Sequence, residues 1–214
     1  MKRTKTPSAR AVTAVLSAGA LLAFAGTAQA ALQDRDLEGD SVVDAFYDTD
    51  LDITWLCNAD VNGTMDWDTA VAWADRFSFA GYDDWRLPTT LQPDPSCSRQ
   101  SGGVSDGRNC TGSEMGHLWH VELGNSGSMT NTGNFQNLQH STYWSATEYA
   151  PNPSGFAWYF HTGMGTQYAQ NKNVPKYAMA VRAGDVAAIP EPQTYALMLA
   201  GLGALALVQR RRQR

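Results

Sequence analysis

The stretch GYDDWRLPT spans residues 81–89 and places a short strand near the middle of the chain. Residues 84–88 form the expected strand, which ends at Pro88 because proline cannot donate a hydrogen bond to a sheet. Trp85 lies in this apolar segment, so we expect its ring in the core. For Arg86, and for Arg182 in a later apolar segment, we expect structural ion pairs or contacts with carbonyls. The alternative for both arginines is a site for a carboxylate or sulfate ligand.

Segments on both sides of this stretch predict a mixed α+β domain. Before it, two apolar runs predict a hairpin over residues 42–47 and 53–56. Asp66 is the expected N-cap of a helix over residues 67–77. After it, the pattern predicts a second helix over residues 114–123 and strands over residues 143–146, 156–161, 167–169 and 178–182.

Four segments together resemble the Lcl C-terminal domain family: GYDDWRLPT at 81–89, GSEMGHL at 112–118, YWSATEY at 143–149 and AVR at 180–182. The resemblance implies a C-type-lectin-like fold with two helices, a small, mostly antiparallel sheet, and long loops that carry any ligand. RLPT at 86–89 is also similar to the formylglycine-generating enzymes, which share that fold. Their reactive cysteine pair near the C-terminus has no counterpart after Cys110. We therefore expect no enzyme.

The first 30 residues have the order of a secretory signal peptide. Basic residues at the start precede an apolar run over residues 11–25, and Ala28-Gln29-Ala30 supplies the small residues that signal peptidase needs. The mature chain is expected to start at Ala31. An uncleaved membrane anchor is the alternative.

The last residues, 189–214, resemble the PEP-CTERM sorting signal. Its three parts occur in order: Pro190-Glu191-Pro192, apolar residues 195–208, and the basic residues Arg210, Arg211, Arg212 and Arg214. The resemblance implies export across the inner membrane of a Gram-negative bacterium and transient anchoring by a C-terminal hydrophobic helix. Removal of the tail by an exosortase would then release the chain to the cell surface or biofilm matrix. The alternative is a permanent C-terminal anchor.

The segment between the two signals, residues 31–188, suits one domain. It holds eight basic and 20 acidic residues, a formal net charge of −12. Nucleic acid is therefore excluded as a partner, because its phosphates would be repelled.

Three cysteines in an exported chain predict one disulfide and one free thiol. Cys97 and Cys110 bracket a polar stretch rich in Ser, Gly and Asn that has little apolar surface to order it, so we expect them to pair. Cys57 would be the free thiol, although its pairing with either of the others stays open.

The acidic run over residues 34–52 is the candidate cation site, and Asp48, Asp50 and Asp52 at the predicted hairpin turn are its expected ligands. Calcium is the expected ion, because it binds six to eight oxygen ligands. The alternative is a solvated arm and an ordinary turn. Glu114, His117 and His120 do not predict a metal site, because steps of three drift around an α-helix.

We expect most of the seven tryptophans to build the core. Tyr149, Phe156 and Trp158 are the candidate binding residues, since loop aromatics can stack on sugars. These features predict a noncatalytic glycan- or exopolysaccharide-binding module. The alternative is a structural, acidic matrix protein without a pocket, which calcium could crosslink.

Overall fold

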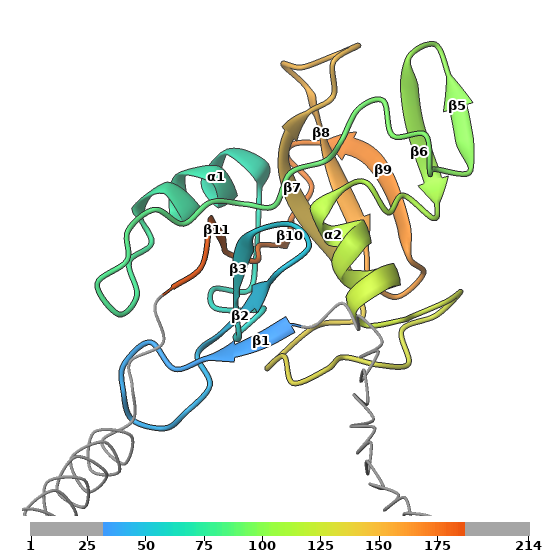
Figure 1. Ribbon diagram of the computed structural model, residues 1–214. Helices are drawn as coiled ribbons and strands as arrows, with labels where there is room; N and C mark the ends of the chain where they lie inside the picture. Colours follow the sequence, from blue (N-terminus) through green and yellow to red (C-terminus); the bar gives the residue numbers. More distant parts are fainter. Residues whose placement is uncertain (1–31, 187–214) are drawn as a thin grey trace, which may run out of the picture.

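The computed structural model describes residues 32–186, which form two sheets and two helical segments joined by long connections (Figure 1). The predicted signal peptide with Ala28 and Ala30, and the tail with its Pro-Glu-Pro and arginine motifs, lie outside these residues. Within residues 32–186, no helix is long and apolar enough to cross a membrane. The mixed α+β class is confirmed.

The first sheet has the strand order β1-β2-β3-β11, with every neighbouring pair antiparallel. Its strands are Leu32–Arg35, Ala45–Asp48, Ile53–Leu56 and Val181–Ala183. The predicted hairpin is confirmed, since Asp48 of β2 lies opposite Ile53 of β3. Both ends of the described chain therefore belong to one sheet, where the Arg35 Nε lies 2.7 Å from an Asp185 carboxylate oxygen.

The second sheet has the order β4-β10-β7-β8-β9-β6-β5 and is antiparallel except where β10 pairs with β7. In that order its strands are Thr64–Met65, Lys176–Tyr177, Thr142–Glu148, Phe156–His161, Thr166–Asn171, Val104–Arg108 and Arg99–Ser101. The expectation of a single small sheet was wrong. Strands β1, β4, β5, β6 and β10 come from polar segments without alternating hydrophobicity, so the sequence pattern did not predict them.

Helix α1, Trp67–Arg76, confirms the first predicted helix. Asp66 caps it, with a carboxylate oxygen accepting from the Thr69 N–H at 2.8 Å. The helix packs on the second sheet through its apolar face, and the Trp67 indole donates to the Ser145 carbonyl of β7 at 2.8 Å.

The second predicted helix is not α-helical throughout. Helix α2 covers only Glu114–His117, and a π-helical turn, η1, continues it over Leu118–Glu122. The Leu123 N–H bonds to the Leu118 carbonyl, five residues back. The wider turn contains the buried Trp119, whose indole donates to the Thr162 carbonyl at 2.6 Å.

The stretch 81–89 does not form the predicted strand. Arg86 makes a single bridge with Val181 of β11, and both backbone hydrogen bonds of that pair are present. The ladder does not continue past Pro88, whose carbonyl instead accepts from the Ala146 N–H of β7. The segment therefore joins the two sheets. Trp85 is 2% exposed, as expected of a core residue.

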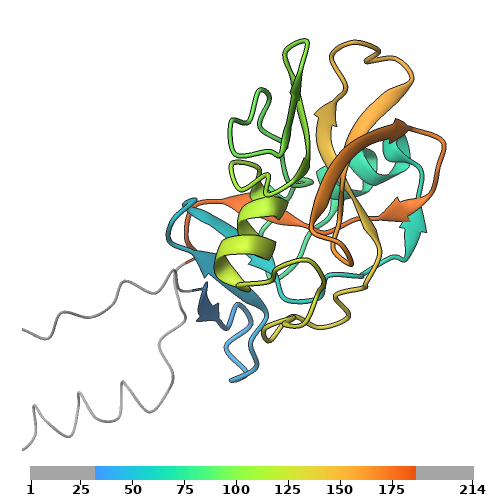
Figure 2. The same cartoon turned by 90° about the vertical axis from the view of Figure 1, so that its right-hand side faces the viewer.

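Tryptophans dominate the core, as predicted. Six of the seven are buried: Trp55, Trp67, Trp85, Trp119, Trp144 and Trp158. Five of them divide among three hydrophobic clusters: Trp55 and Trp119 in one, Trp67 and Trp144 in the second, and Trp85 in the third. Figure 2 shows β1 at one end of the molecule and the β5–β6 hairpin at the other.

Candidate functional site

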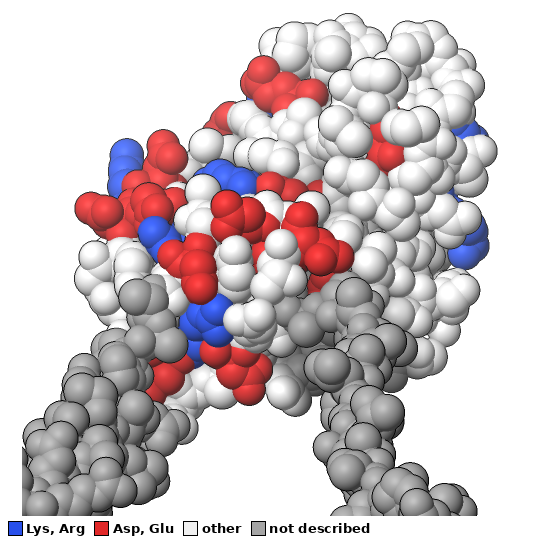
Figure 3. Space-filling view, viewed as in Figure 1, with Lys and Arg blue, Asp and Glu red and all other residues white. Residues whose placement is uncertain are grey.

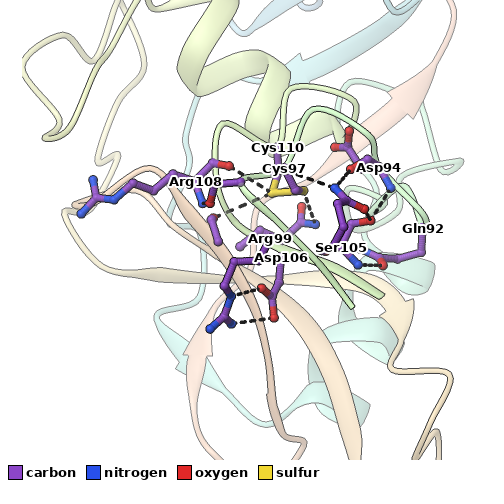
Figure 4. A network of polar contacts seen from close by, with 12 residues as sticks. Gln92, Asp94, Cys97, Arg99, Ser105, Asp106, Arg108 and Cys110 are labelled. Carbon is purple, nitrogen blue, oxygen red and sulfur yellow. Dashed lines mark hydrogen bonds and ion pairs between the residues drawn. A yellow bond between two sulfur atoms is a disulfide. The ribbon is translucent and has the colours of Figure 1, made fainter. Parts of the chain in front are cut away.

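The polar stretch between Cys97 and Cys110 folds into the β5–β6 hairpin, and the predicted disulfide closes its base (Figure 4). Cys57, buried under the first sheet, is the free cysteine within residues 32–186. The thiol's pKa is raised by burial, so Cys57 is a poor nucleophile.

Side-chain hydrogen bonds to the backbone order the base of this hairpin. The Gln92 amide donates to the Ser105 carbonyl at 2.7 Å and accepts from the Ser105 N–H at 2.8 Å. The Asp94 carboxylate, on a residue 1% exposed, accepts from the Ser96 and Gly112 N–H groups. Polar contacts and the disulfide thus replace the hydrophobic core that this segment lacks.

An open groove of about 620 Å³ lies between the β5–β6 hairpin and the end of β7. It is lined by Ser98, Arg99, Gln100, Ser101, Val104 and Asp106 from the hairpin and by Tyr149 from the other side. The tips of the β5–β6 and β7–β8 hairpins lie side by side in Figures 1 and 2. We call this hollow the hairpin groove.

The three aromatic residues predicted to bind ligand come together beside the hairpin groove. The Tyr149 ring lies edge-on to Trp158 with centroids 5.5 Å apart, and 6.4 Å from the Phe156 ring. Tyr149 and Phe156 are half-buried, whereas Trp158 is only 2% exposed. Trp158 therefore has no free face for a ligand, because its place in β8 turns it into the core, where it supports Tyr149.

Arg99 supplies the charge of the hairpin groove. Its guanidinium binds both carboxylate oxygens of Asp106 and lies over the Tyr168 ring, 5.3 Å from the centroid. Hydrogen bonding to Asp106 raises the pKa of Arg99, so the guanidinium stays charged. A planar cation fixed beside an aromatic ring can donate to hydroxyl or carboxylate oxygens.

Most acidic residues on the face shown in Figure 3 lie away from the hairpin groove, although Asp106 lines it. In Figure 3, Asp and Glu crowd over the first sheet and α1, while the part that carries β5 and β6 shows few charges on this face. The net negative charge of the domain therefore does not exclude a neutral or weakly acidic sugar from the hairpin groove.

In the predicted calcium site, the Asp48 and Asp52 carboxylates have different hydrogen-bond donors. The buried Asp48 carboxylate accepts from the N–H groups of Asp50 and Leu51, which closes the β2–β3 turn. The Asp52 carboxylate instead accepts from the Tyr47 hydroxyl at 2.8 Å. Asp48, Asp50 and Asp52 do not bring their carboxylate oxygens together in this turn of the described chain.

Arg86 and Arg182 both form structural ion pairs, as expected. The Arg86 guanidinium binds both oxygens of Glu114, which also accepts from the Thr89 N–H. Arg182 binds both oxygens of Asp84 and lowers the pKa of that carboxyl. Glu114 is thus committed to Arg86 and is not part of a metal site with His117.

Comparison with family models finds the PEP-CTERM protein-sorting motif at residues 188–213. This motif confirms the interpretation of the tail and implies an exported protein that an exosortase sorts, with a C-terminal membrane anchor. It points to the surface or the extracellular space of a Gram-negative bacterium. Among curated proteins, none matches the chain. The match lies outside the folded residues 32–186, so the resemblance of that domain to the Lcl family stays a prediction.

Proposed function

We propose that the folded domain is a noncatalytic module that binds extracellular polysaccharide in the hairpin groove. The observation that carries this proposal is the pairing of Tyr149 with a polar hairpin across one open hollow. Sugar rings present apolar C–H faces that stack on aromatic rings, and hydroxyls that need polar partners. The hairpin groove offers both kinds of contact.

The rigidity of the groove supports the same proposal. Trp158 holds one side in place, and the Cys97–Cys110 disulfide holds the other. A preorganised site loses less conformational entropy when it binds a flexible chain. Export, which the sorting motif implies, also supports the proposal, because it exposes the domain to extracellular polymers.

The test measures binding of the purified full chain to exopolysaccharide from the producing organism by isothermal titration calorimetry. Saturable binding is expected, and Tyr149→Ala should weaken it about tenfold, or ~1.4 kcal/mol. Tyr149→Phe should bind nearly as the wild type does, because the stacking face remains. Tyr47→Ala, a half-buried tyrosine in the first sheet, is the matched control and should bind normally.

Binding that survives Tyr149→Ala unchanged would exclude the hairpin groove as the site. If no saturable binding is seen, the better description is a structural acidic matrix protein without a ligand pocket.

A further inference from the structure

A second cluster of side chains lies far from the hairpin groove, between the first sheet and the second helix. Asp48 ends β2, His117 ends α2 and Glu122 ends η1. Each offers one ligand atom, and these three atoms lie within 4.8 Å of one another. The His117 Nε2 is 3.2 Å from a Glu122 carboxylate oxygen, and Asp50 approaches the same nitrogen at 3.8 Å.

The π-helical turn is what brings His117 and Glu122 together. In an α-helix with 3.6 residues per turn, side chains five positions apart point roughly 140° away from each other. The wider turn closed by the Leu118 carbonyl places both on the side that faces Asp48. Single π-helical turns are rare and occur frequently at functional sites.

The Glu122 side chain is buried with one of its two carboxylate oxygens unpaired among the residues that the structure describes. Its side chain is 1% exposed, and within residues 32–186 its Oε2 atom has no hydrogen-bond partner. Asp48 is fully buried beside it. A buried carboxylate oxygen without a partner is costly, and a cation bound between Glu122 and Asp48 would remove that cost.

We propose that Asp48, His117 and Glu122 bind a divalent transition-metal ion, with zinc the best chemical match. One imidazole nitrogen with carboxylate oxygens is a ligand set that zinc accepts, whereas calcium prefers oxygen alone. The N–H groups of Asp50 and Leu51 orient the Asp48 carboxylate from behind. Asp50, whose side chain is 47% exposed, lies on the solvent side and can complete the coordination.

The test uses the full chain, purified in mild detergent and stripped with a chelator that is then removed. Zinc, manganese and calcium are titrated separately, and binding is followed by calorimetry and by the unfolding temperature. Zinc should bind at one site per chain and raise the unfolding temperature, because a ligand that prefers the folded state stabilises it. Cobalt should produce visible d–d absorption that zinc abolishes.

Glu122→Gln keeps the size of the side chain and removes its charge. This variant should lose at least about tenfold in zinc affinity, since even residues behind the ligands change affinity by 10–100-fold. Without metal it should unfold at the wild-type temperature or above, because a buried charge is gone. His117→Gln should also lose zinc binding.

Two control variants test whether zinc binds at this site or to exposed carboxylate and histidine side chains elsewhere. Glu38→Gln removes an exposed carboxylate in the acidic arm, and His140→Gln removes an exposed histidine. Both should bind zinc as the wild type does. The proposal is overturned if stripped wild-type protein shows no zinc-dependent shift, or if Glu122→Gln keeps the full shift.

Discussion

At the scale of single residues, the Arg86–Glu114 pair ties the 81–89 segment to the second helix. Glu114 is 15% exposed and accepts hydrogen bonds from both Arg86 and the Thr89 N–H. Glu114→Gln should lower the free energy of unfolding by roughly 1.5–3 kcal/mol, the usual range for hydrogen bonds to charged groups. Urea denaturation measures this difference.

The matched control for that prediction is Asp106→Asn, which breaks an equally bidentate pair with Arg99. Arg99 is 63% exposed, so solvent screens the interaction. The expected loss is therefore smaller than the loss for Glu114→Gln. Equal losses in the two variants would show that burial does not set the strength of these pairs.

His161 should make stability depend on pH. Burial lowers its pKa below the ordinary value of 6.5, and neighbouring His140 and Lys176 lower it further. The unfolded chain therefore binds a proton first as pH falls, so stability is complete above about 6.5 and decreases below it. His120, whose pKa burial also lowers, acts in the same direction. His161→Gln should reduce the slope of unfolding free energy against pH below 6.5; an unchanged slope would contradict this role.

The sequence predicted the roles of residues that depend on their own apolar segment. It did not predict the contact of Glu122 with His117, which depends on a π-helical turn. Arg86, Arg182 and Trp85 were predicted correctly because an arginine or tryptophan in an apolar run has few stable environments. Glu122 was missed as a partner of His117, because the spacing was judged by α-helical geometry. A run of buried side chains over Leu118 and Trp119 gives no sequence signal for a π-helical turn.

At the scale of elements, α1 depends on its cap. Asp66→Ala removes the acceptor for the Thr69 N–H and should lower the unfolding temperature. Asp68→Ala, an exposed residue in the first turn of the same helix, is the control and should lower the unfolding temperature less. Thermal unfolding of both variants would show whether the N-cap hydrogen bond of Asp66 or only a negative charge near the helix start stabilises α1.

The β5–β6 hairpin depends on its disulfide. Cys97 and Cys110 are separated by 13 residues, and closing a loop of this length contributes about 3 kcal/mol in the chain-entropy model. The Cys97→Ser/Cys110→Ser variant should lose about that much stability, and polysaccharide binding should weaken with it. Cys57→Ser is the comparison, and it should leave binding unchanged. Full polysaccharide binding by the double variant would show that the hairpin groove does not depend on the disulfide.

Elements with strong periodicity were predicted well, and elements formed from polar residues were not. The β2–β3 hairpin, α1, β7 and β8 follow apolar patterns that few other structures would bury. Strands β5 and β6 consist of RQS and VSDGR, which carry no alternation. The disulfide and the Gln92 and Asp94 contacts fix them instead. One side of the hairpin groove was therefore expected only as a loop region.

At the scale of the whole molecule, the fold ends just before the sorting motif. Val186 is 1% exposed and packs in the core, while the motif begins at residue 188. A chain that ends after residue 187 should unfold at the same temperature as one that keeps the tail. A chain that ends after Gly184 loses Val186 and the Arg35–Asp185 pair, and should be less stable by roughly 1.5–3 kcal/mol. Calorimetric unfolding of the two truncations tests this boundary.

Because the first and last described strands share one sheet, the folded domain is held from a single end. The β5–β6 hairpin, which lines the hairpin groove, lies at the other end, as Figures 1 and 2 show. A molecule still tethered by its C-terminal anchor would therefore present the hairpin groove on the side away from the membrane. If the groove binds polymer as proposed, we expect binding to begin before the tail is cut. Cells lacking exosortase activity should then retain fluorescent exopolysaccharide through the uncut protein, and the Tyr149→Ala protein should retain much less.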